Sequence, residues 1–341
     1  MTIRERIRST GIRRSVGIRD DFSYRRASGG AVSPADRRRI LGLKIPPAWT
    51  EVFVAGSPRQ AVQAVGKDAA GRWQYLYRPD HTSRRARAKF DRLIAFGRAL
   101  PALRLALKRD LRLRGLPRDK ALACAIAIMA TSFLRAGSEE YAEANGTFGL
   151  ATLRRRHVSV RGSRIRFDYK GKHGLRQRHE VVNRRLATIV AAMLHHPGDD
   201  AFKYFDDDGR VCDVSRWQLN QYVKRVMGGS FSARDFRTWA GTWICAGALA
   251  RADRRRGATG CRDLAIDAAV RETSEYLGNS ERVCRGSYIH PGVLLAFARG
   301  ATVGCVLPRP EEVLARRGLG LDRPERALIE LLAGSRPRAK R

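Results

Sequence analysis

The apolar residues of this chain change their spacing near residue 79, and this change divides the fold. Upstream, short alternating runs such as EVFV (51–54) and WQYLY (73–77) are separated by Gly, Pro and Asp turn signals, a pattern typical of antiparallel strands. Downstream, segments such as PRDKALACAIAIMATSFLRAG carry apolar residues at helical spacing. We therefore predict an α+β fold in three parts: a small sheet-rich N-terminal domain over residues 1–78, a larger mainly α domain over 79–305, and a basic C-terminal tail over 306–341.

Local signals predict the elements of the first domain. After a basic leader, FSYR (22–25) and QAVQAV (60–65) are further candidate strands. One helix is expected between them, because Ser33 and Pro34 supply a cap and a first-turn proline, and Gly42 supplies a stop.

The second domain follows an expected hinge at residues 78–80 (Arg-Pro-Asp). Within it, three alternating runs between residues 157 and 182, the last of them RHEVV, predict an antiparallel three-stranded sheet with Lys172 in its second turn. Helices are expected before and after this sheet. Those after it are RRLATIVAAML, VSRWQLNQYVKRVM, a segment from Ala233 to about Ala252, one from Arg262 to Leu277 and one after Pro291.

Basic residues far outnumber acidic ones, and the excess limits what the chain binds. Lys and Arg number 67 against 33 Asp and Glu, a net charge of +34. Such a charge repels itself unless a polyanion is the usual partner. Most of the cations are arginines, whose planar fork grips phosphate oxygens in pairs. Nucleic acid is therefore the expected partner.

An anionic membrane is the competing polyanion, and two features argue against it. No apolar run approaches the roughly 20 residues that span a bilayer, and the N-terminus MTIRERIRSTGIRR has no apolar signal core. The six cysteines form no CxxC pair and follow no regular spacing, which predicts reduced thiols and no metal centre. We expect a cytoplasmic, nucleoid-associated protein with no membrane partner.

A set of polar residues in the second domain suits phosphodiester cleavage. Cutting a strand without losing the bond energy requires a nucleophile that stays on the phosphorus, donors for the non-bridging oxygens and an acid for the leaving 5′-oxygen. Tyr288, in the basic segment CRGSYIHPGVL, is the candidate nucleophile. Arg135 and Arg237 are candidate donors, Lys172 on its turn is a candidate acid, and Asn279 offers an amide N–H.

Each of these residues also has an ordinary explanation. An arginine that closes an apolar helix, as Arg135 is expected to do, complements the helix dipole. By default Arg237 would pair at the surface with Asp235. Lys172 lies in a Gly-flanked turn, and Lys170 is a rival for its role.

The same residues carry a family resemblance. LRAGSEEYAEANGTFGLATL, the hairpin GKHG, RDFRTWAGT and LGNSERVCRGSYIHP look like the catalytic motifs of type IB DNA topoisomerases, in that order. In the amino-terminal region, LKIPPAW, GKDAAGRWQYLY and AKFDRL resemble the clamp domain of the bacterial members. The similarity runs from about residue 11 to residue 300 and is to the small monomeric enzymes of bacteria and poxviruses.

The resemblance implies a catalytic pentad of Arg135, Lys172, Arg237, Asn279 and Tyr288. Tyr288 would form a DNA 3′-phosphotyrosyl intermediate, the two arginines and Asn279 would bind the non-bridging oxygens, and Lys172 would protonate the 5′-oxygen. Poxvirus, eukaryotic and most recombinase relatives have histidine where Asn279 stands, whereas bacterial members have asparagine. The implied enzyme is a monomer that clamps double-stranded DNA and relaxes positive and negative supercoils without ATP, metal or another cofactor.

The resemblance also implies a set of DNA contacts. The stretch RPDHTSRRAR departs from the bacterial pattern at one of them, Arg85. The set comprises Gln74, Tyr75 and Tyr77, which match a clamp-domain QYxY pattern, Arg85 at the hinge helix, Tyr141 as a phosphate contact, and Arg234, three residues before the catalytic arginine.

Two alternative functions are compatible with the charge. A tyrosine site-specific recombinase uses a similar Arg, Lys, Arg and Tyr arrangement, but recombinases usually have a helical amino-terminal domain and a histidine where Arg234 stands. A non-catalytic architectural DNA-binding protein would need the charge alone, and it leaves the ordered pentad unexplained.

Overall fold

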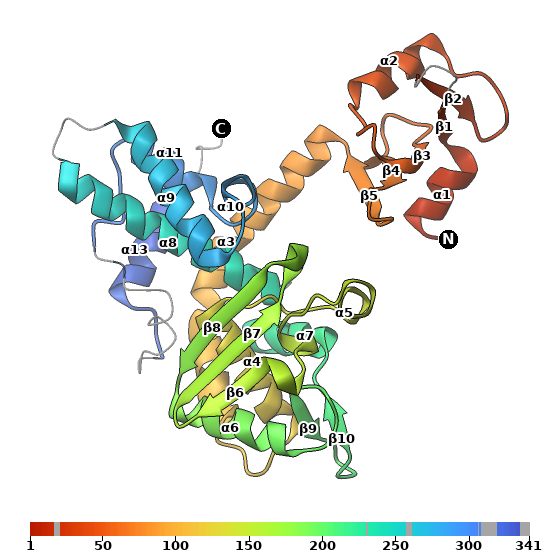
Figure 1. Cartoon of the computed structure of the whole chain (residues 1–341). Coiled ribbons are helices and arrows are strands. Elements are labelled where there is room, and N and C mark those ends of the chain that lie inside the picture. The colour runs from red at the N-terminus through yellow and green to blue at the C-terminus, as the bar shows by residue number, and fades with distance from the viewer. Residues whose placement is uncertain (17–20, 230, 257–260, 306, 308–318, 335–341) are drawn as a thin grey trace. The chain divides into compact units, whose positions relative to one another are not determined.

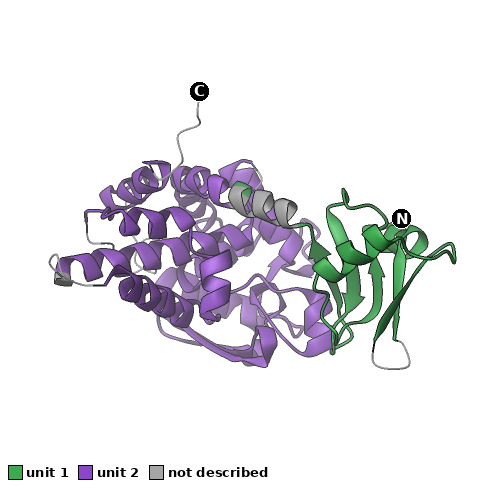
Figure 2. Ribbon diagram, turned by 90° about the horizontal axis from the view of Figure 1, so that it is seen from above, with its two compact units in different colours: residues 1–89 green, residues 90–341 purple. Residues whose placement is uncertain are grey.

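The chain separates into two units, residues 1–89 and 90–341, and the boundary falls inside a long helix, α3 (Pro79–Asp110) (Figure 2). The computed structural model describes residues 1–16, 21–229, 231–256, 261–305, 307 and 319–334, and the side chains of residues 79–87, 89, 255 and 256 lie outside that description. The proline of the expected hinge is the first residue of α3, a position that suits proline. The predicted α+β fold is confirmed.

Unit 1 contains a five-stranded antiparallel sheet with the strand order β2-β1-β3-β4-β5 (Figure 1). The strands and the helix that the sequence predicts in this region are present. The helix begins after Ser33, whose hydroxyl accepts a hydrogen bond from the Asp36 N–H at 3.1 Å. The elements are α1 (Ile3–Thr10), β1 (Ile12–Val16), β2 (Phe22–Arg26), α2 (Pro34–Gly42), β3 (Thr50–Val54), β4 (Val62–Lys67) and β5 (Trp73–Tyr77).

The basic leader also folds, which the sequence analysis did not predict. Ile7 of α1 packs against Val62 and Val65, and Ile12 of β1 packs in a second cluster with Val54. Each of these elements contributes few buried apolar residues among its arginines. A hydrophobic period cannot be recognised from so few positions.

Unit 2 is organised around α4 (Arg118–Ser132), which is buried along residues 121–130 and packs against α6, α7 and α8 (Figure 1). The helices predicted from the sequence are present, whereas the short elements α5, α10, β9 and β10 were not predicted.

No helix in the described part of the chain combines the length and apolarity needed to cross a bilayer. The remaining elements are α5 (Glu139–Asn145), α6 (Arg184–His195), β9 (Lys203–Phe205), β10 (Val211–Asp213), α7 (Arg216–Met227), α8 (Ala233–Arg256), α9 (Arg262–Leu277), α10 (Glu281–Ser287), α11 (Pro291–Ala298) and α13 (Arg323–Gly334).

The predicted three-stranded sheet forms from β6 (Val158–Arg161), β7 (Arg164–Lys170) and β8 (Arg176–Val182), in that order and antiparallel. Along β7, Ile165, Phe167 and Tyr169 are buried and alternate with exposed charged residues. The buried face packs against α4 and α6, so the β7–β8 turn is carried on a sheet that is fixed to the core.

Residues 323–334, which the sequence analysis placed in the basic tail, form α13, and this helix packs against α11. Leu328 and Leu332 are fully buried there. The helix is also joined to α3 by an ion pair between Arg104 and Glu325, whose side chains are 6% and 0% exposed. Arg104 donates a further hydrogen bond to the Gly320 carbonyl at 2.8 Å.

Breaking this ion pair should destabilise the protein. Glu325→Ala leaves the Arg104 charge buried without its counter-ion, and we expect the free energy of unfolding to fall by about 3 kcal/mol. The double variant Arg104→Met/Glu325→Leu removes both charges and should lose less. Denaturant unfolding of the full chain measures the difference, and a loss below about 1 kcal/mol in Glu325→Ala would contradict the expectation.

Candidate active site

The candidate nucleophile, Tyr288, lies at the end of α10 and packs directly against α8. Gly241 of α8 permits this approach, because a Cβ there would lie 2.7 Å from the Tyr288 carbonyl oxygen. The Thr242 hydroxyl accepts a hydrogen bond from the His290 N–H at 3.1 Å and lies 3.3 Å from the same Tyr288 oxygen. His290 caps α11 through Nδ1. The backbone around Tyr288 is therefore anchored to two helices.

Arg237 lies one turn before Gly241 on α8 and is buried against Tyr288. The residue is 5% exposed, and its guanidinium donates hydrogen bonds to the carbonyl oxygens of Phe133 and, at 2.7 Å, of Leu277. Its Cζ lies 5.2 Å from the centre of the Tyr288 ring. Among the described residues its Nε is buried without a hydrogen-bond partner.

The surface pair between Arg237 and Asp235, which is the ordinary alternative, does not form. Asp235 instead accepts hydrogen bonds from Arg92 at 2.8 Å and from the Ser232 hydroxyl at 2.9 Å. It thus occupies the first turn of α8, where a carboxylate suits the helix dipole.

Arg135 lies in the loop between α4 and α5. The prediction that it closes a helix is wrong. The helix α4 stops at Ser132 because Phe133 adopts the left-handed conformation, with φ of 53°. The Leu150 N–H donates to the Arg135 carbonyl oxygen at 2.8 Å. Gly149 makes room for this contact, since a Cβ there would lie 2.6 Å from the same oxygen. A tertiary contact therefore positions Arg135.

Asn279 links the two arginines. It follows Gly278, which caps α9 in the left-handed conformation with φ of 58°. The Asn279 side-chain oxygen accepts a hydrogen bond from Arg135, and its amide nitrogen donates to the Leu277 carbonyl at 3.3 Å. Arg237 donates to the same Leu277 carbonyl. One short loop thus brings both guanidiniums and the Asn279 amide together.

Positive charges around Tyr288 change its acidity. Burial alone would raise the pKa of the phenol, but the charges of Arg237, Arg234 and Arg135, with a hydrogen bond from Arg237, outweigh burial and lower the pKa below the ordinary value of 10.0. Burial, followed by the charge of Arg135, also lowers the pKa of Arg237. The cations therefore make the Tyr288 phenol easier to ionise, and they gather where an anion would bind.

Arg234 should assist the ionisation of Tyr288. Arg234→Ala removes one of the charges that lower the phenol pKa, so that pKa rises and more of the tyrosine stays protonated at neutral pH. We expect the increase of the cleavage rate with pH to move to higher pH, measured as single-turnover cleavage between about pH 6 and pH 10. Arg234→Lys keeps the charge and is the control. A profile identical to the wild type in Arg234→Ala would contradict this role.

Lys172 lies in the turn between β7 and β8 and is exposed. The Gly171 N–H closes this turn by donating to the Leu175 carbonyl at 2.8 Å. In the described part of the chain Lys172 makes no hydrogen bond or ion pair with the other four pentad residues. Its rival Lys170 lies on the exposed face of β7, opposite the face that buries Tyr169.

Two aromatic residues that the sequence analysis did not connect with the site lie beside the arginines. Tyr169 of β7 and His179 of β8 stack with ring centres 6.4 Å apart. Burial, followed by the charges of Arg237 and Arg135, lowers the pKa of His179 to about 4, so its imidazole is neutral at neutral pH. Burial raises the pKa of Tyr169. The alternation along β7 indicates the buried face, but it does not indicate which residues that face meets.

The DNA contacts expected in unit 1 lie on β5, an edge strand of the sheet. Tyr75 and Tyr77 are 40% and 36% exposed and occupy alternate positions, so their rings share one face of the strand. Gln74 is half-buried and donates a hydrogen bond to Asp68 at 2.8 Å.

The DNA contacts expected in unit 2 are exposed wherever the structure describes their side chains. Tyr141 on α5 is 53% exposed, and Arg234 is exposed in the first turn of α8. Arg85 lies within α3, and its side chain is outside the described residues.

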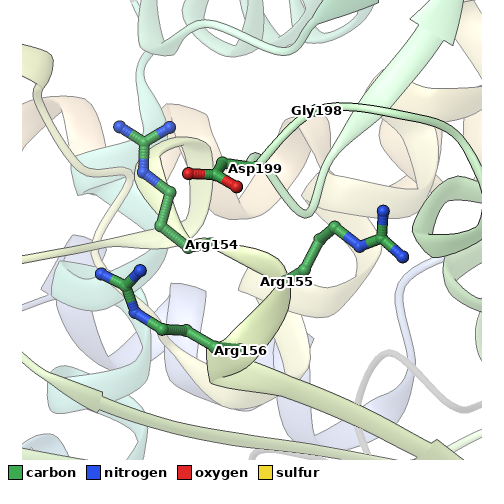
Figure 3. Close-up of a pocket in the computed structure, with 5 residues that line it drawn as sticks. All are labelled: Arg154, Arg155, Arg156, Gly198 and Asp199. Atoms are coloured by element: carbon green, nitrogen blue, oxygen red, sulfur yellow. The ribbon is translucent and has the colours of Figure 1, made fainter.

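A second basic feature of unit 2 is a pocket of about 360 Å³ lined by Arg154, Arg155, Arg156, Gly198 and Asp199 (Figure 3). The three arginine side chains extend in different directions in Figure 3. Arg154 pairs with Asp200, and Arg155 donates to the His196 carbonyl at 3.3 Å. None of the lining residues belongs to the pentad.

Two protein families match this chain. The catalytic core of eukaryotic DNA topoisomerase I matches residues 79–292, a range that contains the whole pentad. The N-terminal domain of bacterial DNA topoisomerase IB matches residues 21–68. The two matches fall on opposite sides of the start of α3.

Individual viral proteins are also similar to it. A DNA topoisomerase 1B of Acanthamoeba polyphaga mimivirus is 31% identical over 264 residues, which are 76% of this chain and 79% of the viral protein. A DNA topoisomerase 1B of Vaccinia virus (strain Copenhagen) and a DNA topoisomerase I of Monkeypox virus are each 25% identical over 168 residues. These last two matches cover 48% of this chain and 52% of each viral protein.

Proposed function

We propose that this chain, which belongs to the type IB DNA topoisomerase family, relaxes positive and negative supercoils by nicking and resealing one DNA strand. No ATP, metal or other cofactor takes part. The observation that carries the proposal is the contact between Tyr288 and the buried Arg237, in which the phenol pKa is lowered and one arginine N–H has no partner among the described residues. This is the arrangement that a tyrosine nucleophile facing a phosphate requires.

The reaction consists of two transesterifications. Tyr288 loses its phenolic proton to solvent, its oxygen bonds to the phosphorus, and the bond to the 5′-oxygen breaks as that oxygen takes a proton from Lys172. The 5′-hydroxyl end then rotates about the intact strand. Finally it returns its proton to Lys172, attacks the 3′-phosphotyrosine and releases Tyr288. One phosphoester bond replaces another, so torsional strain in the DNA sets the direction.

The two arginines and Asn279 neutralise the charge that builds on the non-bridging oxygens. Arg237 is held by two carbonyl groups and keeps its Nε–H for the phosphate. Arg135 is held by the side-chain oxygen of Asn279, whose amide N–H supplies a further donor. Because these donors are fixed before DNA binds, little reorganisation is needed in the transition state.

Double-stranded DNA is the proposed partner, bound by a monomer that clamps the duplex. The net charge of +34 favours phosphate contacts throughout the chain. Tyr75 and Tyr77 of β5, together with Gln74, Tyr141, Arg234 and Arg85, are the proposed contacts. The nucleoid of the cytoplasm is the corresponding location.

Relaxation of supercoiled plasmid in EDTA without nucleotide tests this function. We expect positively and negatively supercoiled DNA to be relaxed, and denaturation with SDS to trap protein covalently on a 3′ end. Covalent trapping without relaxation, or trapping at one sequence by a protein tetramer, would favour the recombinase alternative. DNA binding without any covalent adduct would favour an architectural protein.

A further inference from the structure

Two of the proposed catalytic residues are each preceded by a glycine, and both glycines lie against the side chain of Gln177. Gly171 comes directly before Lys172, and Gly278 comes directly before Asn279. Gln177 is a half-buried residue of β8. One amide side chain thus lies between the turn that carries Lys172 and the loop that carries Asn279.

The glycine at position 171 is explained by Gln177 and not by the backbone. Its φ of −91° and ψ of −168° are extended values that any L-residue adopts. A Cβ at this position would lie 2.5 Å from Gln177 Cγ, which is much closer than the distance of about 3.5 Å at which non-bonded carbon atoms pack. The turn and the stem of Gln177 are therefore packed with no free space between them.

The other end of the same side chain meets Gly278. A Cβ there would lie 3.3 Å from Gln177 Oε1 and 3.6 Å from Nε2. The Gly278 carbonyl accepts a hydrogen bond from Arg135 at 3.5 Å, and the adjacent Asn279 accepts another from Arg135. The carboxamide of Gln177 thus adjoins the loop that orients a phosphate-binding arginine.

We propose that Gln177 is a positioning residue that holds the Lys172 turn at a fixed distance from the Asn279 loop. The proposal rests on the role of Lys172 as the acid under the proposed function. Lys172 is a long side chain on an exposed turn, and proton transfer needs its nitrogen within about 3 Å of the leaving oxygen. A misplacement of about 1 Å can cost on the order of 100-fold in rate. The packing of Gln177 against both glycines supplies the required spacing.

The test compares two leaving groups in single-turnover cleavage with saturating enzyme. When sulfur replaces the 5′-oxygen at the cleaved bond, the leaving group departs as a thiolate without an acid, because thiols have a pKa of about 8.5. Lys172→Ala should be slowed about 100-fold on the oxygen substrate and should approach the wild-type rate on the sulfur substrate. Gln177→Ala should be slowed about tenfold on the oxygen substrate and should recover in the same way.

A second pair of variants tests the contact itself. Gly171→Ala adds a Cβ that collides with Gln177 Cγ, so it should displace the turn and show the same leaving-group dependence. In Gly171→Ala/Gln177→Ala the colliding atom is gone, and the double variant should cleave no more slowly than Gln177→Ala alone. If the two defects multiply instead, the packing contact does not set the position of the turn.

Arg176→Ala is the matched control, because it changes the adjacent residue on the exposed face of the same strand, where Arg176 pairs with Asp168 at 2.7 Å. It should stay within about threefold of the wild type, with equal ratios on both substrates. Recovery of Lys172→Ala but not of Gln177→Ala on sulfur overturns the role of Gln177, as does a wild-type rate of Gln177→Ala on oxygen. If neither variant recovers, the assignment of Lys172 as the acid fails, and this proposal fails with it.

Discussion

Tyr288→Phe should abolish strand cleavage while leaving DNA binding intact. Phenylalanine keeps the ring that lies 5.2 Å from Arg237 but lacks the oxygen that would bond to the phosphorus. We expect cleavage to fall by a factor on the order of 10⁴ or more, because the variant lacks the oxygen that forms the proposed covalent intermediate. The measurement is the yield of covalent protein–DNA adduct on a denaturing gel, together with plasmid relaxation.

Two controls accompany this variant. The DNA dissociation constant should match that of the wild type. It is measured at one fixed salt concentration because salt strongly affects such affinities. The unfolding transition should shift by no more than the loss of one hydrogen bond from Arg237, because the backbone contacts of Tyr288 with Thr242 and Gly241 do not involve the hydroxyl. An adduct of wild-type yield in Tyr288→Phe would show that another residue is the nucleophile.

Arg237→Ala should produce the second largest defect. The guanidinium is one of the charges that lower the pKa of Tyr288, and its Nε–H is the proposed donor to a non-bridging oxygen. Loss of one preorganised donor commonly costs 100- to 1,000-fold, and here we expect about 1,000-fold because the nucleophile loses its stabilising charge as well. Single-turnover cleavage measures the effect, and raising the pH should recover a part of the rate, since the phenol pKa is higher in this variant.

Folding must be separated from chemistry for Arg237. Its removal leaves the carbonyl groups of Phe133 and Leu277 without this donor, which destabilises the fold by about 1 to 3 kcal/mol for each buried group that stays unsatisfied. Rates are therefore compared well below the unfolding temperature of the variant. Arg92→Ala, which breaks the ion pair with Asp235 at the start of α8, is the control and should cleave at nearly the wild-type rate. A rate within tenfold of the wild type in Arg237→Ala would contradict its proposed role.

Features that depend on residues close together in the chain were predictable. The change from alternating to helical spacing indicated the α+β fold, because each period reflects local backbone geometry. The Ser33 cap and the turn at Lys172 were placed correctly for the same reason. The limit of this reasoning is visible at α1 and β1, where arginines obscure the buried residues Ile7 and Ile12.

Local patterns misplaced Arg135, although they identified it as a candidate. Its helix was expected to continue as far as Gly137, since the apolar period runs into FLRAG. Phe133 instead turns the backbone into the left-handed region, and Leu150 binds the released loop through the Arg135 carbonyl. The contact with residue 150 stabilises that ending, and a short sequence window does not include it.

By itself the sequence determined the types and order of most of the longer elements and the inventory of chemical groups, because these follow from residue identity and short-range spacing. Only the tertiary structure decided which groups touch. Arg237 reaches Leu277 across 40 positions, and Arg135 reaches Asn279 across 144, because α4, α8 and α9 pack on one core. Gln177 lies just outside the strand that the sequence predicted, and its contacts with Gly171 and Gly278 arise from that packing. Contacts of this kind depend on how whole elements fill space together, and no local pattern encodes them.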